Sequence, residues 1–174
     1  MAEFGFISDK LEIKCLILYI ASRLVGPAPF EMIQELGMCD DGVDYFAFSE
    51  CMADMVRTQH LELDGDGLYV ITEKGRSNAA ATESSLPFTV RMQVDRDVVA
   101  CNEQLKRRSL VGAVIAPRPE GGCVLSLSLS DDKDPLMKLE LLVTREDMAK
   151  DMQKNFRAHA EEIYGKILSA LYGG

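Results

Sequence analysis

Five cysteines and two histidines are the side chains of this sequence best suited to metal binding or nucleophilic chemistry. The cysteines are widely spaced, at Cys15, Cys39, Cys51, Cys101 and Cys123. No two of them have the two-residue gap that lets thiolates hold one ion, and only His60 and His159 could add a ring nitrogen. We therefore expect reduced cysteines in apolar surroundings, without a disulfide framework or a bound metal.

Acidic and hydroxyl side chains show no recognisable catalytic pattern either. The run Asp64-Gly65-Asp66-Gly67 opens like a calcium-binding loop, but its twelfth position is Gly75, where such a loop needs a glutamate. A glycine-rich phosphate loop, a Gly-x-Ser-x-Gly elbow and a paired-histidine motif are all missing from the sequence. We expect no enzymatic activity and no cofactor.

Charge is divided unevenly along the 174 residues. Residues 1–83 contain six basic and fifteen acidic side chains, and their net charge of −9 equals that of the whole chain. Residues 84–174 contain thirteen of each and are balanced. Because like charges repel, the acidic first half disfavours a polyanionic partner such as DNA.

Hydrophobic periodicity predicts three helices in the first part of the chain. The first covers residues 9–24, with Ser8 as a suitable N-cap and an apolar surface on more than one side. The second covers residues 30–36 and ends at Gly37. The third covers residues 44–57, and its buried stripe includes Phe48, Met52 and Met55.

The period then changes from that of a helix to that of a strand. Leu61 and Leu63 alternate with Glu62, a tight Asp-Gly turn follows, and residues 68–71 are apolar again, which predicts a β-hairpin. Thr72 can cap a fourth helix. Three helices followed by a hairpin is the order of a winged helix-turn-helix domain, which we place at residues 1–83.

The second half predicts an α+β domain at residues 84–174. Small residues at 79–85 indicate a linker, and a helix follows from Pro87 to Arg108. Alternating apolar residues in segments 110–116, 125–130 and 137–143 predict a three-stranded antiparallel meander with one buried face. Thr144 can cap a long C-terminal helix that bends near Asn155. The fold class is therefore α/β of the α+β type.

Several short motifs carry a resemblance to a known family. They are Asp9-Lys10-Leu11 leading into Leu16-Ile17-Leu18-Tyr19, Tyr45-Phe46, Ile71-Thr72-Glu73-Lys74-Gly75, and Asn155 with Ala160-Glu161-Glu162-Ile163-Tyr164. In these motifs the chain resembles an uncharacterised family of Gram-positive bacterial proteins, classed as a domain of unknown function. The resemblance implies a winged helix with a C-terminal α/β region and a role like that of a transcription regulator. It implies no activity and no site residues.

Candidate DNA contacts follow from the predicted winged helix. If the third helix entered the major groove, Tyr45, Ser49 and Arg57 would be its outward contacts. Lys74 and Arg76, directly after the hairpin, would meet phosphates. These five residues are the predicted DNA-binding set.

The charge of the same elements opposes this hypothesis. DNA affinity comes mostly from basic side chains, typically about 6–10 of them. The third helix offers Arg57 alone against three acids, Asp44, Glu50 and Asp54. Two alternatives therefore stay open: a protein-interaction or dimerisation module with the same fold, and a regulator that senses a small molecule.

The C-terminal helix has an apolar stripe longer than a small sheet needs. We expect part of it to form a homodimer interface through Met148, Met152, Phe156, Ile163 and Ile167. No apolar run approaches the roughly 18 residues of a membrane span, and no cleavage signal follows the run 15–21. We expect a cytoplasmic protein without a membrane partner.

Overall fold

The computed structural model of the chain describes residues 6–7 and 9–173. Its elements are, in order, α1 (Lys10–Arg23), α2 (Phe30–Gly37), α3 (Tyr45–Arg57), β1 (Leu61–Leu63), β2 (Tyr69–Ile71), α4 (Glu73–Thr82), the 3₁₀ helix η1 (Glu83–Ser85), α5 (Phe88–Ser109), β3 (Val111–Pro117), β4 (Cys123–Ser130), β5 (Pro135–Val143) and α6 (Glu146–Tyr172). This mixed architecture, with a three-stranded antiparallel sheet and a long C-terminal helix, confirms the predicted α+β class. The chain divides into two compact units, Met1–Lys106 and Arg107–Gly174, here called the N-terminal and C-terminal units.

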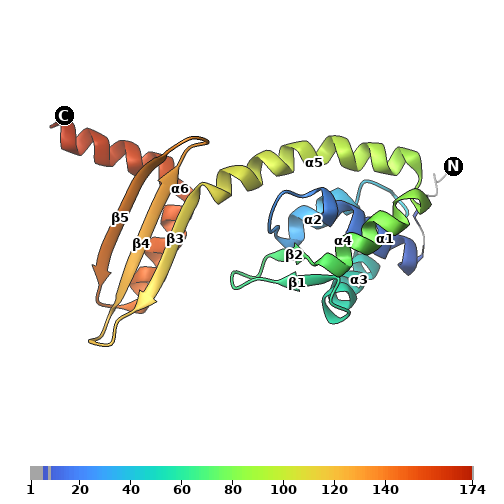
Figure 1. The fold of residues 1–174 in the computed structure, drawn as a ribbon, viewed down its shortest axis with the longest axis horizontal. Coiled ribbons are helices and arrows are strands. Elements are labelled where there is room, and N and C mark those ends of the chain that lie inside the picture. Colours follow the sequence, from blue (N-terminus) through green and yellow to red (C-terminus); the bar gives the residue numbers. More distant parts are fainter. Residues whose placement is uncertain (1–5, 8, 174) are drawn as a thin grey trace. The chain divides into compact units, whose positions relative to one another are not determined.

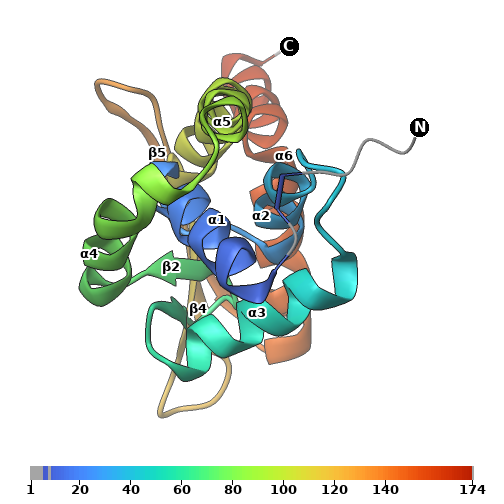
Figure 2. The same ribbon diagram turned by 90° about the vertical axis from the view of Figure 1, so that its right-hand side faces the viewer.

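Helix α1 forms the centre of the N-terminal unit. Asp9 caps it, because its carboxylate accepts a hydrogen bond from Glu12 N at 2.8 Å while the Glu12 side chain accepts one from Asp9 N at 3.3 Å. Ser8, the expected cap, lies outside the described residues. Figure 2 shows α1 between α2, α3 and α4, and α1 packs against all three, so it is buried on more than one face.

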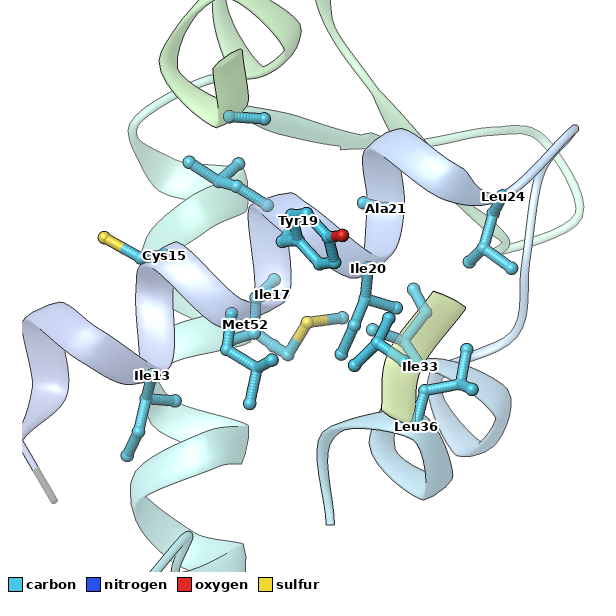
Figure 3. Packing of buried hydrophobic residues seen from close by; sticks show 14 of the residues in the cluster. Ile13, Cys15, Ile17, Tyr19, Ile20, Ala21, Leu24, Ile33, Leu36 and Met52 are labelled. Carbon is cyan, nitrogen blue, oxygen red and sulfur yellow. The ribbon is translucent and has the colours of Figure 1, made fainter. Parts of the chain in front are cut away.

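Apolar side chains from α1, α2 and α3 fill the core of this unit. Figure 3 shows Ile20 of α1 beside Ile33 and Leu36 of α2, with Met52 of α3 close by. All four side chains are almost fully buried. Full burial of one such side chain stabilises a fold by about 1.5 to 3 kcal/mol, so this cluster holds the three helices together.

The short β1–β2 hairpin closes one side of the N-terminal unit. Leu61 pairs with Ile71 in an antiparallel register, and both are buried. The Asp64 carboxylate accepts hydrogen bonds from the backbone N–H groups of Asp66 and Leu68, each at 2.9 Å, which fixes the turn. A further antiparallel bridge joins Tyr69 to Ala28 in the connection between α1 and α2.

The segment expected to be a linker is helical and belongs to the N-terminal unit. Ala79 is buried in α4, and the Glu83 carboxylate in η1 lies 3.2 Å from Arg23 Nη2 of α1. Helix α5 then adds four buried side chains to the same core, Val90, Val94, Val98 and Leu105. For this reason the compact unit extends to Lys106, whereas the sequence placed the domain boundary after Glu83.

A three-stranded meander and α6 make up the C-terminal unit. The sheet order is β3-β4-β5, and along β4 the leucines Leu125, Leu127 and Leu129 are buried while the serines between them are half-buried, as the alternation predicted. Helix α6 lies against one face of this sheet (Figure 1). Its Phe156 side chain is buried in the core of this unit.

The start and the bend of α6 both differ from the prediction. Its N-cap is Arg145 rather than Thr144, and no side chain caps it through a hydrogen bond. The helix is interrupted at His159, where φ is −133° and ψ is 27°, four positions after the expected bend at Asn155. Among the described residues, no helix combines the length and the apolar character needed to cross a bilayer.

Candidate functional site

The side of α3 that is not buried forms a candidate binding surface. It carries Tyr45, Phe46, Ser49, Glu50, Ala53, Asp54 and Arg57, here called the α3 face. Helix α3 presents these residues because Phe48, Cys51, Met52 and Met55, at helical spacing, are buried in the core formed with α1 and α2. The α3 face thus includes the three predicted groove contacts Tyr45, Ser49 and Arg57.

Aromatic side chains dominate the first turn of the α3 face. Phe46 is 78% exposed and Tyr45 is 47% exposed, and their rings meet edge to face with centroids 5.5 Å apart. Leu11 is 71% exposed and lies in the first turn of α1, next to Lys10, which is ion-paired to Glu50 of α3. Phe46 and Leu11 were missing from the predicted site. Their place outside the buried stripes of two amphipathic helices was the signal that could have found them.

Three basic side chains beside or on α3, Lys10, Lys14 and Arg57, are each paired with an acid of α3. Lys14 Nζ lies 2.9 Å from Asp54 Oδ2, and Arg57 Nη2 lies 2.7 Å from Asp54 Oδ1. The hydrogen bonds from Lys14 and then Arg57 hold the pKa of the Asp54 carboxyl at about 2. Lys10 Nζ lies 2.7 Å from Glu50 Oε2. Arg57, predicted to contact DNA, is therefore ion-paired within its own helix.

The hydroxyl of Ser49 also has a partner within its helix. Ser49 Oγ donates to the carbonyl oxygen of Tyr45 at 3.0 Å, a back-bond that serine often forms one turn along a helix. Ser49 is half-buried. Contact with a base edge would require this bond to be broken or shared.

Lys74 has a structural role at the junction of α3 and α4. Its Nζ donates to the carbonyl oxygen of Thr58, the C-cap of α3, at 2.8 Å. The Thr72 hydroxyl accepts from Gly75 N at 3.1 Å and so caps α4, as predicted. A Cβ at position 75 would lie 2.2 Å from the carbonyl oxygen of His60, so the close approach of α4 requires glycine there. The motif that follows the hairpin is explained by these local contacts.

His60 joins the same junction as a neutral imidazole. Its Nε2 accepts from the amide of Asn78 on α4 at 2.7 Å, so Nδ1 carries the proton and faces Thr58 Oγ1 at 2.8 Å. Burial, and then the positive charges of Lys74 and Lys14, lower the pKa of His60 below its ordinary 6.5. The imidazole therefore connects the end of α3 to α4.

Arg76 lies apart from the α3 face. It is exposed on α4 and lines a small pocket of about 50 Å³ with residues that include Leu24, Tyr69 and Ile71. A space of this size suits one or two water molecules rather than a ligand. Of the five residues predicted to contact DNA, Tyr45, Ser49 and Arg57 share one face, whereas Lys74 and Arg76 lie on another helix.

All five cysteines are free thiols in the structure. Cys15, Cys51 and Cys123 are buried. Burial, together with the neighbouring charge of Asp40, raises the pKa of the Cys39 thiol to about 11, which keeps it in the unreactive thiol form. Within residues 6–7 and 9–173, no three histidine, cysteine or acidic side chains are placed so that they could hold a metal ion.

The residues expected at a dimer interface on α6 do not form one exposed surface. Phe156 is only 1% exposed because it packs into the sheet, and Met152 and Ile163 pack partly against the same cluster. Met148 is exposed and Ile167 is half-buried. The sheet thus uses Phe156 in its own core, and that residue cannot reach a second chain.

Comparison with known proteins assigns the chain to a family. No curated protein and no solved structure matches it significantly. A family model described as a domain of unknown function, DUF4364, matches residues 13–171, which include α2 to α5, the whole sheet and nearly all of α1 and α6. The chain therefore belongs to the DUF4364 family.

Proposed function

We propose that the N-terminal unit is a winged-helix module that binds another protein through the α3 face, in a protein of the transcription-regulator type. The order α1, α2, α3, β1, β2 is that of a winged helix-turn-helix domain, in which α3 occupies the place of the recognition helix. What separates this proposal from DNA binding is the chemistry of the α3 face.

The observation that carries the proposal is the pairing of the basic side chains around α3. Lys10, Lys14 and Arg57 are each bound to Glu50 or Asp54. Binding to phosphates would have to break these pairs and bring the duplex against the two carboxylates. The hairpin adds no base, since residues 61–71 contain only acidic charges. The basic side chains here are thus already engaged with carboxylates, which disfavours DNA binding.

The same face has features of a protein-binding surface. Aromatic residues are enriched at the centres of protein interfaces, where they fill pockets on the partner. Phe46 and Tyr45 form an exposed aromatic pair beside the Lys10–Glu50 ion pair. A fitting partner presents an apolar pocket for Phe46, with polar groups at its edge that complement the Lys10–Glu50 ion pair.

A photo-crosslinking experiment tests this proposal. A benzophenone amino acid placed at position 46 is expected to form a covalent adduct with one protein in the native cell. The same amino acid at Ala80, an exposed position of α4, is the matched control. A nucleic-acid adduct at position 46, or equal protein adducts at both positions, would show that the α3 face is not the binding surface.

DNA binding is the alternative, favoured by the order of the elements alone. It predicts retention of genomic fragments at low salt, about 50 mM, with affinity falling steeply as salt rises. The proposal predicts no retention across the series. In the DNA case, the Arg57→Gln variant would weaken binding and reduce the salt slope by about one.

A homodimer through α6 stays a further prediction. With Phe156 buried in the sheet, the interface would have to use Met148, Ile163 and Ile167, together with Leu168 and Leu171, which are 37% and 78% exposed. Light scattering on the full chain at micromolar concentration would measure its mass. A monomer mass throughout would remove the dimer hypothesis.

A further inference from the structure

A groove in the C-terminal unit lies where the helical geometry of α6 is interrupted. It has a volume of about 360 Å³ and is lined by two separate segments, the end of α5 with the start of β3 and residues 157–162 of α6. The non-helical backbone at His159 displaces the second part of α6 from the line of the first. The volume lies within the range of small-molecule sites, about 300 to 1,000 Å³.

Guanidinium groups dominate the lining of this groove. Arg107 and Arg108 come from the last turn of α5, and Arg157 and His159 come from α6. The side chains of Arg107 and Arg108 form no hydrogen bond or ion pair with any residue in the described part of the chain. Two adjacent, uncompensated guanidinium groups repel each other and attract an anion.

Arg157 is positioned by the sheet. Its Nη2 donates to the carbonyl oxygen of Ala113 on β3 at 3.2 Å, and Gln153 Nε2 donates to the same oxygen at 2.7 Å. Ala113 is buried in the sheet, so this anchor is rigid. A guanidinium held in this way binds an anion with less loss of side-chain entropy than a free one.

The acids beside the groove do not cancel this charge. Glu161 and Glu162 line it as well. Glu162 is ion-paired with Lys166, whose Nζ lies 2.6 Å from Glu162 Oε1, and its other oxygen lies 3.8 Å from His159 Nδ1. The excess positive charge of the lining therefore rests on Arg107 and Arg108, with Glu161 as the nearest carboxylate that Lys166 does not bind.

We propose that this groove binds a small molecule carrying one or more phosphate groups, held by Arg107 and Arg108 with Arg157 beside them. Guanidinium groups match phosphate in a two-pronged geometry, and such charge-assisted hydrogen bonds are about twice as strong as neutral ones. Val111 supplies an apolar wall for the rest of the ligand. The site lies in the C-terminal unit and does not depend on the proposed function of the α3 face.

Calorimetric titration of the full chain with pyrophosphate tests the site. The Arg107→Gln/Arg108→Gln variant is expected to bind pyrophosphate at least about tenfold more weakly than the unaltered chain, because it loses the charge-assisted hydrogen bonds of both guanidinium groups. The Lys133→Gln/Lys154→Gln variant removes the same charge from exposed positions elsewhere in the unit and is expected to bind normally. Arg107→Lys/Arg108→Lys keeps the charge but not the fork, and its affinity should lie between the two.

Three results would overturn the proposal. The first is no binding of pyrophosphate by the unaltered chain at about millimolar concentration. The second is an equal loss of affinity in the Arg107→Gln/Arg108→Gln and Lys133→Gln/Lys154→Gln variants, which would show a general charge effect. The third is binding of a DNA duplex without binding of pyrophosphate, which would assign the arginines to a nucleic-acid backbone.

Discussion

Asp40 shows how a single acidic side chain holds several backbone segments of the N-terminal unit. It is the one polar residue that is almost fully buried among those the structure describes. Its carboxylate accepts hydrogen bonds from the backbone N–H groups of Phe6, Ile7 and Gly42, at 2.9, 3.1 and 3.0 Å. The first two donors precede α1, so Asp40 attaches the chain before α1 to the loop between α2 and α3.

Replacing Asp40 by alanine should therefore destabilise the protein. Three N–H groups would lose their acceptor in a mostly buried place, which costs about 1 to 3 kcal/mol or more in the free energy of unfolding. Urea denaturation followed by circular dichroism measures the loss. Asp41→Ala changes the exposed neighbouring carboxylate and should stay within about 0.5 kcal/mol. Equal effects of the two substitutions would contradict the assigned role.

His60 makes the stability of the N-terminal unit depend on pH. Because its pKa is lowered in the folded state, the unfolded chain takes up a proton first as the pH falls. The stabilising contribution of His60 is thus present above about pH 6.5 and is lost as the pH falls through the lower folded-state pKa. Protonation would also remove the acceptor that Nε2 offers to Asn78.

The measurement is the free energy of unfolding at about pH 7.5 and about pH 5. The unaltered chain should lose more stability between these values than the His60→Gln variant, which lacks the imidazole at position 60 and keeps His159. The carboxylates contribute equally to both proteins, so the difference reports on His60. Identical losses would mean that the folded protein accommodates the imidazolium.

Residue identity alone could not show which charges were already paired. Arg57 was a sound candidate for DNA contact by its position in the helix, yet Asp54 binds it together with Lys14, which is 40 residues away in the sequence. Lys74 was chosen because it follows the hairpin, and it donates to the end of α3 instead. Such pairings depend on how elements pack, which periodicity does not report. The groove at His159 was not predicted, because a local break in helical geometry has no clear sequence signal.

At the scale of elements, the amphipathic patterns predicted the helices and strands well. The alternation of leucine and serine predicted β4, and the buried stripe of Phe48, Met52 and Met55 predicted α3. The connection at 79–85 was harder, because small residues suit a linker as well as a closely packed helix. The helical conformation of this segment is stabilised by tertiary contacts, the burial of Ala79 and the ion pair of Glu83 with Arg23.

The junction of α4 with the hairpin predicts a strong effect at Gly75. Gly75→Ala would place a Cβ 2.2 Å from the carbonyl oxygen of His60, a backbone atom that cannot move aside by rotation. Helix α4 would have to shift, at a cost of about 1 to 3 kcal/mol in the free energy of unfolding. The shift would also strain the Lys74 contact with Thr58.

Gly65→Ala is the matched control for this substitution. Gly65 lies in the hairpin turn, where an added Cβ meets nothing within 4 Å. Its replacement should leave stability within about 0.5 kcal/mol of the unaltered chain. If thermal unfolding gives the same midpoint for both variants, a Cβ at position 75 does not clash with the carbonyl oxygen of His60, and the close approach of α4 to this carbonyl is contradicted.

At the scale of the whole molecule, the two units differ in charge as well as in fold. Met1–Lys106 contains nine basic and eighteen acidic residues, a net charge of −9, whereas Arg107–Gly174 contains ten of each. The acidic unit carries the proposed protein-binding face, and the neutral unit carries the proposed phosphate site. Each proposal thus suits the charge of its own surroundings, and the two can be tested separately.

The division after Lys106 predicts how the chain can be cut. A fragment of residues 1–106 keeps α5, whose Val90, Val94, Val98 and Leu105 cover the N-terminal core, whereas a fragment of residues 1–83 exposes the apolar surface beneath them. Each of these side chains contributes about 1.5 to 3 kcal/mol when fully buried. The shorter fragment also loses the Tyr19 hydrogen bond to Asp95 and the contacts of Asn102 with the end of α1.

Urea denaturation should show a cooperative transition for 1–106 and a far weaker or absent one for 1–83. Equal midpoints would instead place the boundary where the sequence pattern put it, after Glu83.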